Sequence, residues 1–453
     1  METIAAINQQ LHAIVWGPSM VALLLLTGVY FTVGTGFFQL RRMGLWLRHT
    51  LFAIFFSREV HRHSDTAAAI SQFQALSTAL AGTIGTGNIV GVAAAIVSGG
   101  PGAVFWMWVS GIFGMMTKYA ENLLGNYYRY RGADGNWIGG PMVYIERGLH
   151  CRWLAVLFAF FCLISTFGIG NLAQANSIAG ALQTSTGLAP AACGILLTLC
   201  TGLVILGGIR RIAAVAERFV PAMALFYLLG SGILLWQYRQ QLPRAFAEIF
   251  SHAFGMQAVG GGVGGYAMMR AIQLGVARSI ASNEAGLGSS VIVNSTSNVR
   301  EPVQQGMWGI FEVFITTLVV CTVTALVILT TGVHHSGTQG AMLAVEAFSC
   351  GFGRFGGMFV SVAIICFAFS SILGWSYYGE SAIRYLSNRK LLNVYKIAFI
   401  GTTMLGCVAQ LDLVWSISDT FNGFMALPNV IAILALSGKV FHLTRVYLQQ
   451  HEF

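Results

Sequence analysis

The chain has 453 residues, of which 56% are hydrophobic and only 9% are charged, and its mean hydropathy is +0.70. Too few residues are polar to cover one or two soluble domains of this length, so the composition excludes a soluble globular protein and favours one that lies in a bilayer. The formal net charge of +9 is typical of the basic cytoplasmic loops of a polytopic protein, and we do not expect a nucleic-acid partner.

A membrane-spanning helix needs about 20 mostly apolar residues, because the hydrocarbon layer is about 30 Å thick and every backbone polar group in it must be bonded internally. The apolar runs predict an all-α protein with about eleven such helices. In chain order the predicted spans lie near residues 14–34, 68–98, 102–124, 152–184, 188–207, 212–237, 258–280, 303–332, 356–386, 391–410 and 412–437.

The distribution of basic residues predicts the orientation, because loops rich in Lys and Arg stay in the cytoplasm. An odd number of spans places the two termini on opposite sides. With the N-terminus outside, 21 of the 25 Lys and Arg residues fall in cytoplasmic segments. We therefore expect a multi-pass plasma-membrane protein, in the inner membrane of a bacterium, with its C-terminus in the cytoplasm.

The predicted spans form one extra helix followed by two blocks of five. Because five is odd, the second block runs opposite to the first, as in the inverted repeats of secondary transporters. The expected segments are an extra helix with a basic cytoplasmic loop, two repeats and a cytoplasmic tail, at residues 1–67, 68–237, 258–437 and 438–453.

Each block opens with a span that glycines interrupt. The first block has Gly82 to Asn88, and the second has Gly260 to Gly265 with Gly275 further on. Matched broken helices predict a binding site at the middle of the membrane. The alternative is that these glycines only permit close helix packing.

The residues Gly99 to Trp108 resemble the signature of the alanine or glycine:cation symporter family at the start of its third span. Further stretches in order along nearly the whole chain are similar to that family: Gly85 to Ile89, Asn171 to Ser177, Ser282 to Ser289, Gly374 to Glu380 and Asn422 to Asn429. The resemblance implies the five-plus-five inverted-repeat fold of the leucine-type sodium symporters, preceded by one helix. One departure is Thr316, where the family usually has an aspartate.

The resemblance implies a secondary active symporter that carries a small neutral amino acid, of the alanine or glycine class, into the cell with sodium by alternating access. Its expected partners are that amino acid, the sodium ion and the lipid bilayer, and no other cofactor or metal is expected.

An amino acid that leaves water needs partners for both of its charges. At a helix break, free N–H groups suit a carboxylate and freed carbonyls suit a cation. We therefore expect Gly85, Thr86 and Gly87 to bind the substrate, and the carbonyls of Ala81 and Ile84 to bind sodium.

In the leucine-type symporters a similar Gly-x-Gly-Asn places its Asn on sodium, so the resemblance implies that role for Asn88. It also places the hydroxyls of Ser370 and Ser371 at the cation, with Ser371 near the substrate as well. The alternatives are helix capping by Asn88 and serines that bond back to their own helix.

Four further residues are candidates from their place in the sequence. Trp375 shares a helix face with Ser371 and is expected to bound the substrate side chain, unless it is a packing aromatic. Gln174, deep in the fourth span, is expected to contact the substrate because a buried amide is costly without a partner. Glu284 and Arg278 are expected in a cytoplasmic, glycine-rich loop, as a gate or a structural ion pair.

Three other functions remain open at this stage. The proposed ion site offers only neutral oxygens, which favours sodium, but Glu312 and Asp419 lie inside predicted spans and leave a proton-coupled amino-acid transporter as the alternative. A channel is disfavoured because channels repeat identical segments around an axis. An intramembrane enzyme is disfavoured because the spans hold few carboxylates and no cluster of His or Cys.

Overall fold

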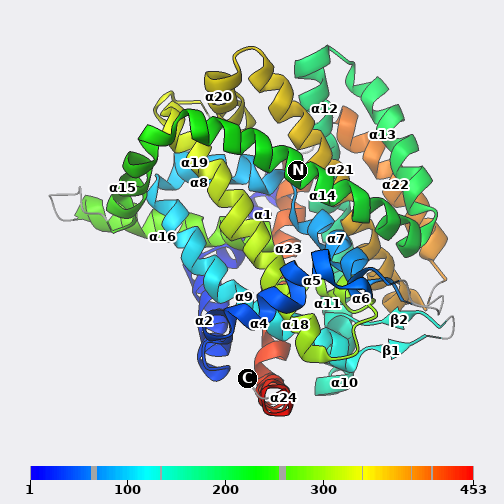
Figure 1. Cartoon of the computed structure of the whole chain (residues 1–453). Helices are drawn as coiled ribbons and strands as arrows, with labels where there is room; N and C mark the ends of the chain where they lie inside the picture. Colours follow the sequence, from blue (N-terminus) through cyan, green and yellow to red (C-terminus); the bar gives the residue numbers. More distant parts are fainter. Residues whose placement is uncertain are drawn as a thin grey trace.

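The computed structural model describes residues 2–62, 69–132, 135–254, 262–338, 340–388, 390–409 and 412–451. This part of the chain is almost entirely helical (Figure 1). Its only paired strands are the two-residue β1 (Tyr130–Arg131) and β2 (Trp137–Ile138), which are antiparallel. The prediction of an all-α fold is confirmed.

Several helices are long and apolar enough to cross a membrane, so this is a multi-pass membrane protein. Six described helical segments meet this criterion: Thr3–Gly34, Arg152–Thr186, Gly208–Gln237, Pro302–Thr331, Phe355–Ser387 and Ser416–Ala435. Shorter apolar helices lie at Met43–Phe56, Val90–Gly99, Pro190–Ile205, Gly340–Phe352 and Leu392–Val408. All eleven predicted spans coincide with described helices, although 68, 258–261 and 410 lie outside the described residues.

The first block begins with a broken helix and ends with an amphipathic one. Its elements are α7 (Gln72–Thr83), η2 (Thr86–Asn88), α8 (Val90–Gly99), α9 (Gly102–Tyr128), α10 (Pro141–Leu149), α11 (Arg152–Phe167), η3 (Gly168–Leu172), α12 (Ala173–Thr186), α13 (Pro190–Ile205), α14 (Gly208–Gln237), η4 (Arg239–Gln241) and α15 (Leu242–Ala253).

The elements of the second block likewise include a short helix between two membrane spans. They are α16 (Gly262–Asn283), α17 (Val291–Asn294), α18 (Pro302–Val313), η5 (Phe314–Cys321), α19 (Thr322–Thr331), η6 (Val333–His335), α20 (Gly340–Phe352), α21 (Phe355–Ser387), α22 (Leu392–Val408), α23 (Asp412–Ala435) and α24 (Ser437–Gln450).

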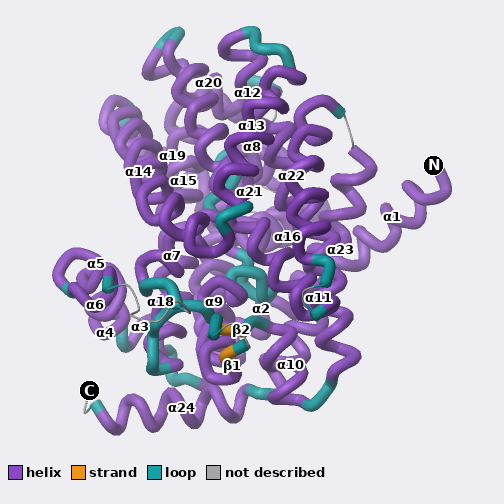
Figure 2. The backbone as a smooth tube through the Cα atoms, turned by 90° about the vertical axis from the view of Figure 1, so that its right-hand side faces the viewer, coloured by secondary structure: helices purple, strands orange, loops and turns teal. Residues whose placement is uncertain are grey.

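The two short helices α10 and α20 make corresponding contacts in the two blocks, as an inverted repeat requires. The short helix α10 packs on α11 of its own block and on α23 of the other, and α20 correspondingly packs on α21 and α14. These two short helices lie at opposite ends of the bundle (Figure 2). The fold is therefore a five-plus-five inverted repeat, as predicted. The exact limits given for the two repeats stay a prediction.

The segment before the repeats is more elaborate than one helix. It contains α1 (Glu2–Val15), α2 (Pro18–Gly34), α3 (Phe38–Arg41), α4 (Met43–Leu47), η1 (Arg48–Phe52), α5 (Ala53–Phe56) and α6 (Arg58–His61). The predicted first span corresponds to α2. The additional α1 packs along α23, where Asn8 Nδ2 donates to Ser416 Oγ at 2.7 Å and His12 Nε2 lies 2.9 Å from Asp419 Oδ2.

The described part of the predicted second break is helical. Of the predicted Gly260 to Gly265 run, Gly260 and Gly261 lie outside the described residues, and α16 continues from Gly262 through Gly275. Gly275 has a packing role instead, because a Cβ there would lie 2.4 Å from the backbone oxygen of Ala103.

The second break follows Asn283, about one helix length later. Glu284, Gly286 and Gly288 have φ angles of 55°, 90° and 77°, in the left-handed region that an α-helix cannot contain. All residues from Asn283 to Ser290 are buried, so the expected cytoplasmic loop is instead part of the interior. Arg278 is exposed, whereas the buried carboxylate of Glu284 accepts a hydrogen bond from Ser289.

The crossing of α7 and α21 yields a test of the fold. A Cβ at Gly374 would lie 2.7 Å from the backbone nitrogen of Gly82, whereas a Cβ at Gly401 of α22 would meet nothing within 4 Å. Gly374→Ala should therefore lower the free energy of unfolding by about 1–3 kcal/mol, because backbone cannot yield as a side chain does. Gly401→Ala is the matched control in thermal unfolding of the purified protein, and equal melting temperatures for the two variants would contradict the crossing.

Candidate functional site

The first break lies between α7 and α8, where it was predicted. Ile84 N–H still donates to Leu80 O at 2.7 Å, as in a helix. The next amide, Gly85 N–H, donates to Asn88 Oδ1 at 3.1 Å. Its helical acceptor, Ala81 O, thus loses that partner, and a carbonyl oxygen becomes free for a ligand.

Two adjacent serines of α21 face this break, and both are 1% exposed. Ser370 Oγ donates to Phe367 O of its own helix at 2.8 Å and lies 3.5 Å from Ile84 O. Ser371 Oγ is buried without a hydrogen-bond partner among the described residues, directly against Gly85. Since a buried hydroxyl normally has a partner, Ser371 is suited to a bound ion or substrate.

The break also faces the fourth span. Thr86 Oγ1 donates to Gln174 Oε1 at 3.3 Å, and Gln174 Nε2 donates to Ile169 O at 3.3 Å. The π-helical η3 precedes Gln174, and such turns widen a helix and often occur at functional sites. Thr86 and Gly87 are half-buried, so the turn itself is accessible.

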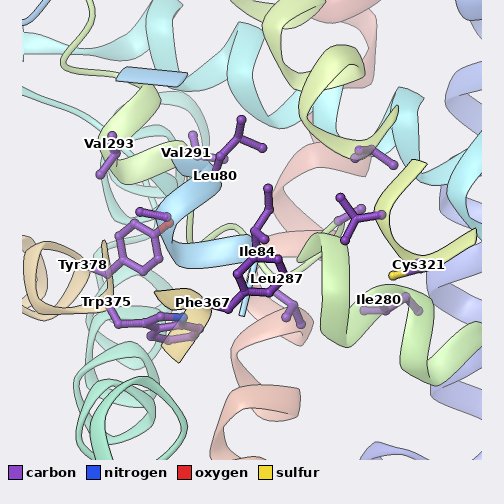
Figure 3. Close-up of a cluster of buried hydrophobic side chains, with 14 of the residues drawn as sticks. Leu80, Ile84, Ile280, Leu287, Val291, Val293, Cys321, Phe367, Trp375 and Tyr378 are labelled. Atoms are coloured by element: carbon purple, nitrogen blue, oxygen red, sulfur yellow. The ribbon is translucent and has the colours of Figure 1, made fainter. Parts of the chain in front are cut away.

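Trp375 packs one turn beyond Ser371 and is 3% exposed. A Cβ at Gly170 of η3 would lie 2.6 Å from Trp375 Cβ, so the indole depends on that glycine. Its ring lies 5.3 Å from that of Tyr378, and both belong to the buried cluster around Ile84 (Figure 3). Trp375 thus lies in the buried cluster that contains Ile84, and its contact with the substrate stays a prediction.

Tyr378 was missed by the sequence analysis. Its hydroxyl is buried without a partner in the described part of the chain and lies against Gly82 of α7. The available signal was spacing, because Ser371, Trp375 and Tyr378 follow an i, i+4, i+7 pattern that places them on one helix face.

Asn88 uses both ends of its amide within the protein. Its Oδ1 accepts from Gly85 N–H. Its Nδ2 donates to Ser282 Oγ at 2.7 Å and to Thr316 O at 3.2 Å. This arrangement supports the capping alternative, and a cation contact by Asn88 stays a prediction. The hydroxyl of Thr316 donates to Glu312 O of its own helix at 2.9 Å.

The fold and this site together define a helical membrane transporter: a broken span at the centre of an inverted repeat, lined by neutral oxygens that include buried hydroxyls without partners. The chain belongs to the sodium:alanine symporter family, whose model matches residues 1–453. The family recognised from the sequence motifs is thus confirmed.

Two relatives match the chain in sequence over almost its whole length. The chain is 42% identical over 456 residues to the sodium/alanine symporter AgcS of Methanococcus maripaludis, which covers 99% of this chain and 98% of the relative. It is 36% identical over 439 residues to the probable sodium/glutamine symporter GlnT of Bacillus subtilis, covering 96% and 89%. A solved Na⁺-coupled sialic acid symporter matches at 14% identity over 96% of this chain and 86% of that chain, with a TM-score of 0.49. Family membership makes the chain a cation-coupled amino-acid symporter.

The two ends of Asn88 can be separated by mutation. Asn88→Ala removes both ends, whereas Asn88→Asp keeps an oxygen for Gly85 N–H but loses the donor to Ser282 and Thr316. We expect both variants to lower sodium-dependent uptake into proteoliposomes. Both lose the Nδ2 donor, and the carbonyl oxygen of Thr316 can only accept, so it is left without this hydrogen bond.

Asn126→Ala is the control for this experiment, since Asn126 is a buried amide that donates to Val299 O outside the break. Wild-type uptake by Asn88→Asp would show that the oxygen alone suffices, as expected of a cation ligand.

Proposed function

We propose that the protein carries alanine, or another small neutral amino acid such as glycine, into the cell together with sodium by alternating access. The observation that carries the proposal is the unpartnered hydroxyl of Ser371 beside the broken end of α7. The name of the Methanococcus relative, a sodium/alanine symporter, agrees with it.

The proposed sodium ligands are neutral oxygens. Ser370 Oγ lies 3.5 Å from Ile84 O, and Ser371 Oγ lies against Gly85 where α7 ends. We assign these two hydroxyls and the carbonyls of Ala81 and Ile84 as the ligands. Hard oxygen ligands bind a small cation without titrating, so this site favours sodium over a proton. Asn88 is retained as a fifth candidate, acting directly or by holding the break.

The substrate site is proposed on the other side of the same break. The N–H groups that open η2, at Thr86 and Gly87, would bind the carboxylate, because a helix start offers unpaired donors. Gln174 would bind a polar group of the substrate, and Trp375 would limit its side chain.

Sodium coupling is tested by removing the hydroxyls. Ser371→Ala should raise the sodium concentration for half-maximal uptake of labelled alanine, and the double variant Ser370→Ala, Ser371→Ala should nearly abolish uptake, because each oxygen lost is a ligand lost. Ser376→Ala is the matched control, since Ser376 is equally buried on α21 but donates to Leu373 O of its own helix.

A panel of labelled amino acids, with and without a sodium gradient, identifies the substrate in the same proteoliposomes. Uptake that follows an imposed pH gradient with sodium absent would contradict the sodium assignment and support the proton-coupled alternative.

We also propose that the N-terminus lies outside and the C-terminus in the cytoplasm of a bacterial inner membrane. The basic hairpin β1–β2, α10 and α24 lie at one end of the bundle (Figure 2), which therefore collects Arg129, Arg131, Arg147, Lys439 and Arg445. Clustered positive charge favours the cytoplasmic side.

Cysteine labelling tests this orientation in a variant whose eight native cysteines are replaced. Glu59→Cys, in the basic segment after α2, should react only when an impermeant reagent reaches the cytoplasmic face. Gln240→Cys, in η4, should react in intact cells, since it lies on the other side. The reverse pattern would invert the topology.

A further inference from the structure

The second break contains charged side chains, unlike the first. Lys118 and Glu121 of α9 and Glu312 of α18 are completely buried, and Glu284 in the break is 3% exposed. Lys118 Nζ donates to the backbone oxygen of Glu284 at 3.0 Å and to Ser290 Oγ at 2.9 Å. It also lies 3.8 Å from Glu121 Oε2 and 3.8 Å from Glu312 Oε1.

The charges in this four-residue cluster do not balance. Three carboxylates surround one ammonium, so full ionisation would leave two excess negative charges in the buried interior. An uncompensated buried charge costs several kcal/mol even after the protein relaxes. Glu121 Oε2 and Glu312 Oε1, which both face Lys118, have no hydrogen-bond partner in the described residues. A bound positive species would reduce this excess.

That species is a proton rather than a metal ion. The ammonium of Lys118 already occupies the position between Glu121 and Glu312, where a metal would need to sit. Among the described residues, no group of three or more His, Cys, Asp or Glu side chains is arranged to hold a metal. A proton needs no such space, because it binds to a single oxygen.

The hydrogen bonds indicate which carboxylate takes the proton. Glu121 Oε1 accepts from Asn429 Nδ2 at 2.5 Å and from Gly286 N at 3.0 Å. Glu312 Oε2 accepts from Asn294 Nδ2 at 3.1 Å. Both also face Lys118 with their second oxygen.

Glu284 has the weakest stabilisation as an anion. Its carboxylate accepts from the hydroxyl of Ser289, while Lys118 bonds to its backbone oxygen. The other titratable groups near the cluster are Tyr144 of α10, which donates to Asn429, and Tyr378 of α21 and Cys162 of α11. None of the three is a basic group, so they add no positive charge.

We propose that the cluster is a proton-binding site and that Glu284 is the carboxyl that holds the proton. The site joins the second break to α9, α18 and α23 through Lys118, Glu312 and Asn429. Loss of the proton places a further negative charge beside Glu312 and Glu121, which weakens this attachment. Opening of the break is thereby coupled to proton release, although the sodium site itself does not titrate.

Infrared difference spectroscopy tests the site without any transport. The purified wild-type protein at neutral pH should show the carbonyl stretch of a protonated carboxyl group, shifted in D₂O. Glu284→Gln should remove that band, whereas Glu301→Gln, at an exposed carboxylate, should leave it unchanged. Ser289→Ala should shift its frequency, because Ser289 donates to Glu284, and this variant serves if Glu284→Gln does not fold.

Two results would overturn the proposal. Absence of a protonated carboxyl band at neutral pH would show that the cluster binds no proton. A band that survives Glu284→Gln but disappears in Glu312→Gln would assign the proton to Glu312.

A transport measurement examines the coupling and rests on the proposed function. Sodium-driven uptake by the wild type should change with pH, and Glu284→Gln should lose that dependence, since glutamine resembles the protonated acid at every pH. An unchanged pH profile in Glu284→Gln would refute the coupling. Absence of uptake by the wild type at every pH would refute the proposed function instead, and the infrared result would be unaffected.

Discussion

The demand that every backbone polar group be satisfied inside the bilayer governs this structure. A span can break only where side chains replace the lost helical hydrogen bonds. At the first break Asn88 Oδ1 accepts from Gly85 N–H. At the second, Glu121 accepts from Gly286 N–H and Lys118 donates to Glu284 O. These side chains fix the breaks and connect them to other spans, so the positions of both central sites follow from this one requirement.

The two breaks occupy corresponding places in an inverted repeat but differ in chemistry. The first presents carbonyl and hydroxyl oxygens, which bind an ion or a zwitterion without changing their own charge. The second holds a lysine and three glutamates, whose energies depend strongly on protonation in a dry environment. The amide of Asn88 reaches Ser282, just before the second break, and thus lies between these two environments.

The sequence predicts the features that depend on local pattern. Every apolar run became a helix, and the first break falls at Gly85 because the Gly-Thr-Gly-Asn order supplies both the flexible residue and its cap. The break after Asn283 was missed because Ser282 to Ser290 has the composition of a loop and is buried only through partners such as Lys118, which lies 166 residues away. Likewise α1 was missed, since its fit against α23 depends on tertiary contacts that periodicity does not contain.

The helix α1 makes the surroundings of α23 differ from those of α14, the corresponding span of the first block. It packs on α23 and bonds to it through Asn8 and His12. Among the described helices, none from outside the repeats packs in this way on α14. The most apolar window of α14 is 33% buried within the protein, against 61% for Ser416–Ala435 of α23. A larger part of α14 than of α23 therefore faces outward from the protein. Bilayer thickness and composition will therefore affect the position of α14 more strongly than that of α23, and the membrane will act unequally on the two halves of the carrier.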